Sequence, residues 1–171
     1  MLVIRQEKNS DYKEVYKLIE NAFKSAEHSD GNEQDLVEKL RTSKNFVKEL
    51  SLVAELDNKI VGYILFTKIK IGNNESSLAL APLAVLPEYQ RKGIGTKLIL
   101  EGHRIAKELG YEYIVVLGSE KYYPRVGYVK AKEYGIKAPF DVDDKNFMAI
   151  KLNDNAEKIN GIVEYAKEFD I

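Results

Sequence analysis

The sequence predicts a mixed α/β (α+β) fold in which helices flank a mostly antiparallel sheet with one parallel pair of strands. Three segments between positions 51 and 86 are rich in β-branched, aromatic or other apolar residues and are separated only by short turns. A helical segment then leads to another apolar strand, and such a strand–helix–strand unit makes its two strands parallel. The 171 residues suit a single domain over positions 1–171, with a tail at 153–171 packed on or beside it.

Composition removes several classes of chemistry. The formal net charge is -1, so no basic excess points to nucleic acid or an anionic membrane as a partner. The chain has no cysteine and two histidines, which excludes a cysteine acyl-enzyme and argues against a multi-histidine metal site, and we expect no metal. The early charge at the N-terminus does not fit a signal peptide, and the apolar stretches are too short for a membrane span. We therefore expect a cytoplasmic protein.

The first part of the chain is expected to hold one short strand and two helices. Residues 3–5 have the pattern of a strand. A helix is predicted to begin near Asp11, which would form a capping box with Glu14, and its apolar residues follow at helical spacing. A polar stretch at 24–32 then separates this helix from a second, shorter one around Val37.

The middle of the chain is predicted to form an antiparallel meander followed by a strand–helix–strand unit. Its three strands are expected at Ser51–Leu56, Ile60–Ile71 and Leu78–Leu86. A polar loop begins at Pro87, and a helix is expected from Gly93 to about Leu109, with Gly110 as the residue that ends it. Residues 113–117 complete the unit as a buried strand.

The last part of the chain gives weaker signals. Residues 120–126 are predicted as a short helix that stops at Gly127. Residues 128–137 and 146–152 are expected to pair as two final strands. The tail is ambiguous, because 161–165 fits either a strand or part of a helix.

The start of the helix at Gly93 has the features of an anion site. The first amides of a helix lack partners inside it, and the helix dipole adds partial positive charge there. Glycines let a pyrophosphate approach the backbone, and Arg91 and Lys92 can add charge. A lone Gly-x-Gly is a weak signal, because tight packing explains it equally well. The dinucleotide fingerprint would need a third glycine where Leu98 stands, and a phosphate loop with Gly-Lys-Ser/Thr is absent.

The stretch from Leu83 to Thr96 closely resembles the acyl-CoA-binding motif of the GNAT superfamily of N-acetyltransferases. The family pattern of Gln or Arg, two residues, Gly, one residue and Gly or Ala is met by Gln90, Gly93 and Gly95. Downstream, Tyr-Pro-Arg-Val-Gly-Tyr at 123–128 is similar to the family's Tyr-x-x-x-Gly-Phe segment. Further matches resemble the YhbS-like branch of predicted N-acetyltransferases.

The resemblance implies a GNAT-like fold and acetyl-CoA as cosubstrate. In this family the two parallel strands splay apart, and the pantetheine arm enters the gap and pairs with backbone groups. Carried over to this chain, the cofactor-binding residues are Leu83, Ala84, Val85, Gln90, Arg91, Lys92, Gly93, Ile94, Gly95, Thr96, Gly118, Ser119 and Tyr122. The acceptor would be a small-molecule or protein amine, and a homodimer is possible because the superfamily often forms one.

The implied reaction is direct attack of a free amine on the thioester in a ternary complex. Tyr123 is predicted to be the acid that protonates the CoA thiolate, with Tyr122 as the alternative. A phenol pKa of ~10 and a thiol pKa of ~8.5 are mismatched by about 1.5 units, or roughly 2 kcal/mol, which a nearby positive charge would reduce. Glu27 is the candidate general base, ahead of its loop neighbours His28 and Asp30.

Three further interpretations concern His103 and two alternative functions of the chain. His103 lies among polar neighbours in the glycine-started helix and is expected to be a surface histidine. The chain as a whole could instead be a non-catalytic acyl-CoA-binding module that kept the fold and lost the chemistry. It could also be a nucleotide-binding protein that uses Gly93 and Gly95 differently.

Overall fold

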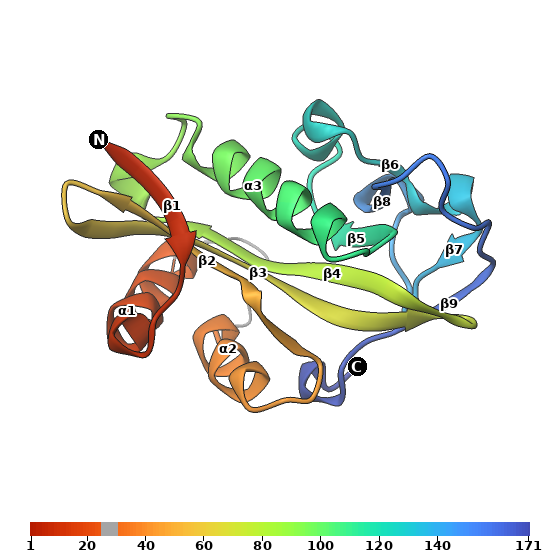
Figure 1. Cartoon of the computed structure of the whole chain (residues 1–171), viewed down its shortest axis with the longest axis horizontal. Helices are drawn as coiled ribbons and strands as arrows, with labels where there is room; N and C mark the ends of the chain where they lie inside the picture. The colour runs from red at the N-terminus through yellow and green to blue at the C-terminus, as the bar shows by residue number, and fades with distance from the viewer. Residues whose placement is uncertain (25–30) are drawn as a thin grey trace.

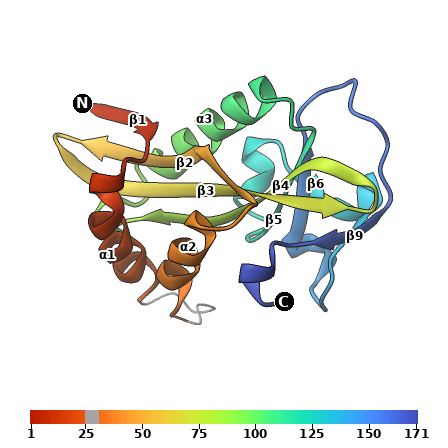
Figure 2. The ribbon, with the colours of Figure 1, turned by 60° about the horizontal axis from the view of Figure 1, so that its bottom comes forward.

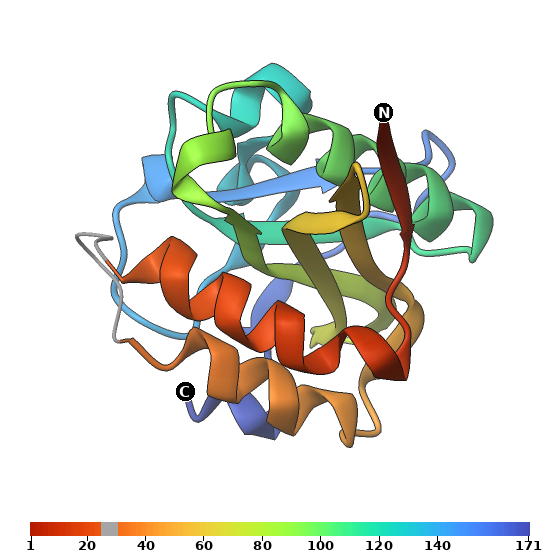
Figure 3. The same ribbon diagram turned by 90° about the vertical axis from the view of Figure 1, so that its left-hand side faces the viewer.

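The computed structural model describes residues 1–24 and 31–171. Helices cover both faces of a twisted sheet: α1 and α2 lie on one face and α3 lies on the other (Figures 1 and 3). The helices are α1 (Tyr12–Phe23), α2 (Glu33–Arg41) and α3 (Ile94–Glu108). The strands are β1 (Leu2–Gln6), β2 (Phe46–Leu56), β3 (Lys59–Ile71), β4 (Asn74–Val85), β5 (Tyr113–Leu117), β6 (Val129–Lys130), β7 (Ile136–Lys137), β8 (Phe147–Lys151) and β9 (Gly161–Glu164).

The sheet has the predicted mixture of strand directions. Its order is β1-β2-β3-β4-β5-β8-β6, and β2, β3 and β4 form the expected antiparallel meander. The strand–helix–strand unit places β4 parallel to β5, as predicted. A second parallel pair, β7 with β9, was not predicted and is only two residues long. The fold class expected from the sequence is therefore confirmed.

Two strands, β2 and β4, begin well before the positions that the hydrophobic pattern predicted. β2 begins at Phe46 rather than Ser51, and the exposed Lys48 interrupts the apolar pattern in the added part. The register of β2 against β3 also shifts between Phe46 and Ser51, which breaks a simple alternation of buried and exposed residues. β4 likewise begins four residues before the predicted Leu78. The added start of β4, residues 74–77, is polar and carries little hydrophobic signal, so the pattern found only the apolar part of this strand.

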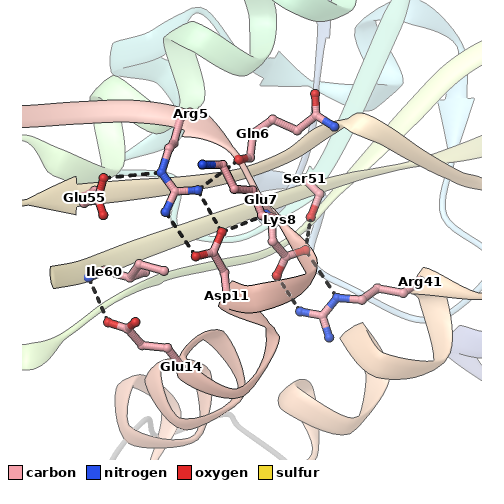
Figure 4. Close-up of polar contacts among 10 residues, drawn as sticks. All are labelled: Arg5, Gln6, Glu7, Lys8, Asp11, Glu14, Arg41, Ser51, Glu55 and Ile60. Atoms are coloured by element: carbon pink, nitrogen blue, oxygen red, sulfur yellow. Dashed lines mark hydrogen bonds and ion pairs between the residues drawn. The ribbon is translucent and has the colours of Figure 1, made fainter. Parts of the chain in front are cut away.

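The predicted capping box at the start of α1 is wrong. The Asp11 carboxylate accepts hydrogen bonds from the Lys8 backbone amide at 2.7 Å and from Arg5 Nη1 at 2.8 Å (Figure 4). Glu14 instead accepts a hydrogen bond from the backbone amide of Ile60 at 3.0 Å. Both carboxylates therefore join α1 to the strands beside it. The Arg5 guanidinium and the Lys8 amide hold the pKa of Asp11 below its usual value, against the opposing effect of burial.

A second polar cluster ties α2 to the sheet. Arg41 donates to Glu7 at 2.6 Å, and the two side chains are only 8% and 2% exposed (Figure 4). Glu7 also accepts a hydrogen bond from the Ser51 hydroxyl, which in turn lies 2.7 Å from the hydroxyl of the fully buried Tyr63. The Arg41 guanidinium stacks 3.9 Å above the ring of Tyr12. A buried charge is tolerated only when it is paired and hydrogen-bonded, and this cluster meets both conditions.

The final strand pair differs from the prediction. Of the strand predicted at 128–137, the residues Val129 and Lys130 pair with β8. Residues 131–134 form a short 3-10 helix, and β7 then pairs with β9 instead of β8. Gly135, at φ 77°, closes this turn in the left-handed region that other residues avoid. The ambiguous tail thus contains a strand: β9 also pairs with the far end of β3 (Figure 2).

Candidate active site

The parallel strands β4 and β5 are hydrogen-bonded over a short distance only. Their register contains three pairs, Ser77–Tyr113, Leu78–Ile114 and Ala79–Val115. Beyond them β4 continues as far as Val85, while the rest of β5 pairs only with β8. In the part of the chain that the structure describes, the last six residues of β4 therefore have no strand partner on the side that faces β5.

Backbone directions identify which groups face this gap. The Leu86 amide donates to the Val61 carbonyl of β3 at 2.9 Å, so Leu86 and, by alternation, Ala84 direct their backbone groups toward β3. Leu83 and Val85 consequently direct theirs toward the gap. The side-chain amide of Gln90 donates to the Val85 carbonyl at 3.0 Å and so fixes the following loop to the end of β4. Of the three predicted strand residues, Ala84 alone has its backbone occupied by the sheet.

The loop after β4 leads directly into the glycine-rich helix start. After a 3-10 turn at Pro87–Tyr89, Arg91 has φ 64° and Gly93, the N-cap of α3, has φ 82°. The Gly93 carbonyl accepts the first helical hydrogen bond, from the Lys97 amide at 3.1 Å. Within residues 1–24 and 31–171, no protein group accepts a hydrogen bond from the six amides of 91–96. Amides without an acceptor at a helix start are the arrangement that an anion site requires, and anion binding by these amides stays a prediction.

The side chains of the loop divide into core anchors and exposed charges. Ile94 is 5% exposed and packs into the main core, which holds the first turn of α3 in place. Arg91 and Lys92 are exposed, and the Lys92 ammonium lies 5.6 Å from the centre of the Tyr89 ring. A Cβ atom on Gly93 would meet nothing within 4 Å, so the space beside this residue is open.

Two tyrosines from the segment after β5 lie against this helix start. The Tyr122 hydroxyl is 3.0 Å from the Thr96 hydroxyl on α3. It would also be 3.1 Å from a Cβ atom on Gly95, with the Leu83 side chain next to the same position. Leu83 on β4, Gly95 and Thr96 on α3, and Tyr122 therefore meet at one place, where the free end of β4 adjoins the first turn of α3.

Tyr123 stands beside Tyr122 at the start of a 3-10 turn over Tyr123–Val126. Its ring lies so close to Gly118, just after β5, that a side chain at Gly118 would overlap it. Burial, and to a lesser extent the neighbouring Tyr122, raises the pKa of the Tyr123 phenol well above its usual value. The phenol is therefore protonated at neutral pH, as an acid must be. Among the described residues, no positive charge lowers the pKa of Tyr123, so burial widens the difference between this pKa and that of a thiol.

The turn between β5 and Tyr122 is held by a residue that the sequence did not single out. Asn146 donates to the Gly118 carbonyl at 3.0 Å and to the Glu120 carboxylate at 3.0 Å. The exposed Ser119 uses its side-chain oxygen to accept from the Lys121 amide, and its carbonyl accepts from the Tyr122 and Tyr123 amides. Ser119 is thus occupied in forming the turn that presents the tyrosines.

The expectation that His103 is a surface histidine is wrong. Its ring is partly buried on the inner side of α3, packed between Phe66 and Tyr128 at centroid distances of 6.4 and 5.4 Å. Its Nε2 atom lies 2.9 Å from the Tyr128 hydroxyl. Burial lowers the pKa of His103 to about 4, so the imidazole is neutral at pH 7. The polar neighbours in the sequence face the other side of the helix.

The predicted general base and the expected absence of a metal site depend on which residues the structure describes. The candidate base Glu27, with His28 and Asp30, lies outside the described residues. In the described ranges no cluster of three or more His, Cys, Asp or Glu side chains has metal-binding geometry. Over the same ranges, none of the helices combines the length and apolar character required to cross a lipid bilayer.

Comparison with known proteins gives relatives over most of the chain. It is 40% identical over 118 residues to YjhQ of Escherichia coli K12, named an uncharacterized N-acetyltransferase; the match covers 67% of this chain and 65% of YjhQ, just under two thirds. It is 31% identical over 124 residues to the similarly named YhbS of the same strain, covering 71% of this chain and 74% of YhbS.

Solved structures agree with the sequence relatives. Escherichia coli YhbS in complex with CoA matches with a TM-score of 0.90 at 28% identity, covering 99% of this chain and 92% of that one. A GNAT family acetyltransferase from Brucella melitensis in complex with acetyl-CoA matches with a TM-score of 0.83 at 33% identity and 99% coverage of both. Residues 12–128 match the acetyltransferase (GNAT) family as a whole, and the chain belongs to that family.

Proposed function

We propose that the protein transfers an acetyl group from acetyl-CoA to an amine acceptor, by direct attack in a ternary complex. One observation carries the proposal: the six free amides at 91–96 adjoin the unpaired end of β4, and both lie next to the tyrosine pair. An extended donor with a doubly charged diphosphate and a thioester at its far end fits this order of groups. The two relatives solved with CoA and acetyl-CoA support the same choice of donor.

The donor would bind mainly through main-chain groups. The amides of 91–96 would hold its diphosphate, aided by the helix dipole and by the exposed Arg91 and Lys92. The pantetheine arm would lie along β4 and pair with Leu83 and with the Val85 amide, whose directions leave them available. The Val85 carbonyl is already taken by Gln90. Gly118 allows close approach of the Tyr123 ring on the other side.

The chemistry begins with a deprotonated amine. Its nitrogen attacks the thioester carbonyl carbon, so a C–N bond forms and negative charge develops on the carbonyl oxygen. A backbone N–H on the gap side of β4 would stabilise this charge. Collapse breaks the C–S bond, and the CoA thiolate takes the proton of the Tyr123 phenol. The nitrogen carries a positive charge after the attack and loses a proton to a carboxylate, for which Glu27 remains our candidate; proton exchange with solvent then returns the phenol and the carboxylate to their starting states.

The proposal also includes the cellular location and the partners of the protein. We place the protein in the cytoplasm, in keeping with the absence of cysteine. The acceptor is a small-molecule or protein amine, with no nucleic acid or membrane as partner, and a homodimer is retained as a prediction. No metal takes part in the proposed steps.

The test is thiol release from acetyl-CoA in the presence of a panel of primary amines. Tyr123→Phe should lower kcat by about 100-fold or more, because a general acid contributes about that much, while Kd for CoA stays within about twofold. Tyr113→Phe is the matched control, since Tyr113 is also a buried tyrosine, but its hydroxyl donates to the Glu157 carbonyl, away from the tyrosine pair. Binding of CoA without turnover on any amine would favour a non-catalytic module. An unchanged kcat in Tyr123→Phe would show that Tyr123 is not the general acid.

A further inference from the structure

The segment that carries Tyr123 is joined to α3 by two side-chain contacts, one on each side of it. Before Tyr123, the Tyr122 hydroxyl meets the Thr96 hydroxyl at 3.0 Å. After it, the Tyr128 hydroxyl meets His103 Nε2 at 2.9 Å. Thr96 and His103 are seven positions apart, about two helical turns, and therefore project from the same side of α3. One side of a single helix thus holds both ends of the tyrosine segment.

The Tyr123 ring is enclosed by the residues that make these contacts. Its centroid lies 5.1 Å from that of Tyr122 and 5.6 Å from that of Tyr128, in edge-on arrangements with interplanar angles of 81° and 76°. Gly118 closes a further side, where no side chain would fit. Within residues 1–24 and 31–171, no hydrogen bond reaches the Tyr123 hydroxyl itself. Among the described residues, packing contacts alone therefore set the direction of this phenol.

The His103–Tyr128 contact joins two neutral groups at neutral pH. Burial raises the pKa of Tyr128 well above its usual value and lowers that of His103 to about 4. Tyr128 is 1% exposed, and a buried hydroxyl without a partner is strongly disfavoured. Tyr128 therefore needs His103 on α3 as the hydrogen-bond partner of its hydroxyl. A phenylalanine would fill the same space without requiring this bond.

We propose that Tyr128 and His103 are positioning residues, which together with the Thr96–Tyr122 contact form a clamp that fixes the Tyr123 phenol relative to α3. This inference rests on the proposed acetyl transfer. The amides that would hold the diphosphate begin the same helix, so the clamp sets the place of the acid relative to the bound donor. Loss of the His103–Tyr128 contact should leave donor binding intact and misdirect the proton.

The test uses Tyr128→Phe, which keeps the ring and removes the hydroxyl, and His103→Leu, which removes the other partner. Each should lower kcat by about tenfold or more, since small misplacements of reacting groups are costly, while KM for acetyl-CoA and Kd for CoA stay within about twofold. His103→Gln offers an amide in place of the imidazole and should restore much of the lost kcat. Tyr113→Phe again serves as the control for loss of a buried hydroxyl, with kcat within about twofold.

A second measurement separates the clamp from the proposed reaction. NMR of protein with labelled tyrosine rings reports the flip rate of Tyr123, whose signals are assigned by their loss in Tyr123→Phe. The rate should rise about tenfold or more in Tyr128→Phe and in His103→Leu. An unchanged flip rate overturns the clamp whether or not the protein turns over. A faster flip in a protein that transfers no acetyl group supports the clamp and rejects the reaction. A loss of affinity for the donor without a loss of kcat also overturns the clamp.

Discussion

The pKa of His103 gives a prediction about stability that does not depend on substrate. A histidine has a pKa of 6.5 without perturbation, and burial lowers that of His103 to about 4 in the folded protein. As the pH falls through 6.5, the unfolded chain binds a proton at this residue and the folded chain does not. Stability is therefore lost as the pH falls from 6.5 toward 4, and the contribution is fully present above 6.5.

The size of the effect follows from the two pKa values. Between about pH 7 and pH 5, the difference in proton binding amounts to about 2 kcal/mol of unfolding free energy. This value is a ceiling, because the ring is only partly buried and water screens the remainder. In the structure the energy corresponds to forcing a charged imidazole into the space between Phe66 and Tyr128.

The assay compares urea unfolding, followed by circular dichroism, for His103 and His103→Gln proteins at about pH 7 and pH 5. Both proteins also carry His28→Gln, so that no histidine other than His103 titrates in either of them. Carboxylates titrate alike in both proteins, and their contribution cancels in the difference. The His103 protein should lose up to about 2 kcal/mol more than the glutamine variant between the two pH values. Equal losses would show that the imidazole is no more buried than in the unfolded chain.

Two further predictions concern packing away from the candidate site. Glu7→Gln should lower the unfolding free energy by about 3 kcal/mol in thermal or urea unfolding, because it leaves the Arg41 charge buried without its partner; Asp57→Asn, which removes an exposed pair with the N-terminus, should change it by less than about 1 kcal/mol. Equal effects of the two changes would contradict this account. Gly102→Ala should cost about 1–3 kcal/mol although alanine favours helices, because its Cβ atom would overlap the Phe66 ring; a higher melting temperature would refute the contact.

Local signals were the part of the structure that the sequence predicted well. The start and end of α3 followed from Gly93 and Gly110, because both lie in the left-handed region that favours glycine. The free amides at that start followed from the same residues. These features need only a few neighbouring positions, and the family resemblance then added the tyrosine segment.

Contacts between distant positions were the part that could not be predicted. His103 and Tyr128 are 25 positions apart, and the polar neighbours of the histidine indicated the wrong side of the helix. Asp11 and Glu14 have the spacing of a capping box, yet Arg5 and the Ile60 amide take their carboxylates. In each case the side chain contacts a residue outside its own helix, and local sequence patterns do not indicate which residue that is.

The free end of β4 has a consequence for how the protein can vary. Groups that belong to the main chain are the same whichever amino acid occupies a position. A donor recognised through the amides of 91–96 and the backbone of Leu83 and Val85 would therefore tolerate exchange of most side chains along its path. The positions that resist exchange are those where a Cβ atom has no room, such as Gly118. Residues around the acceptor can thus diverge toward new amines while the donor half of the reaction stays intact.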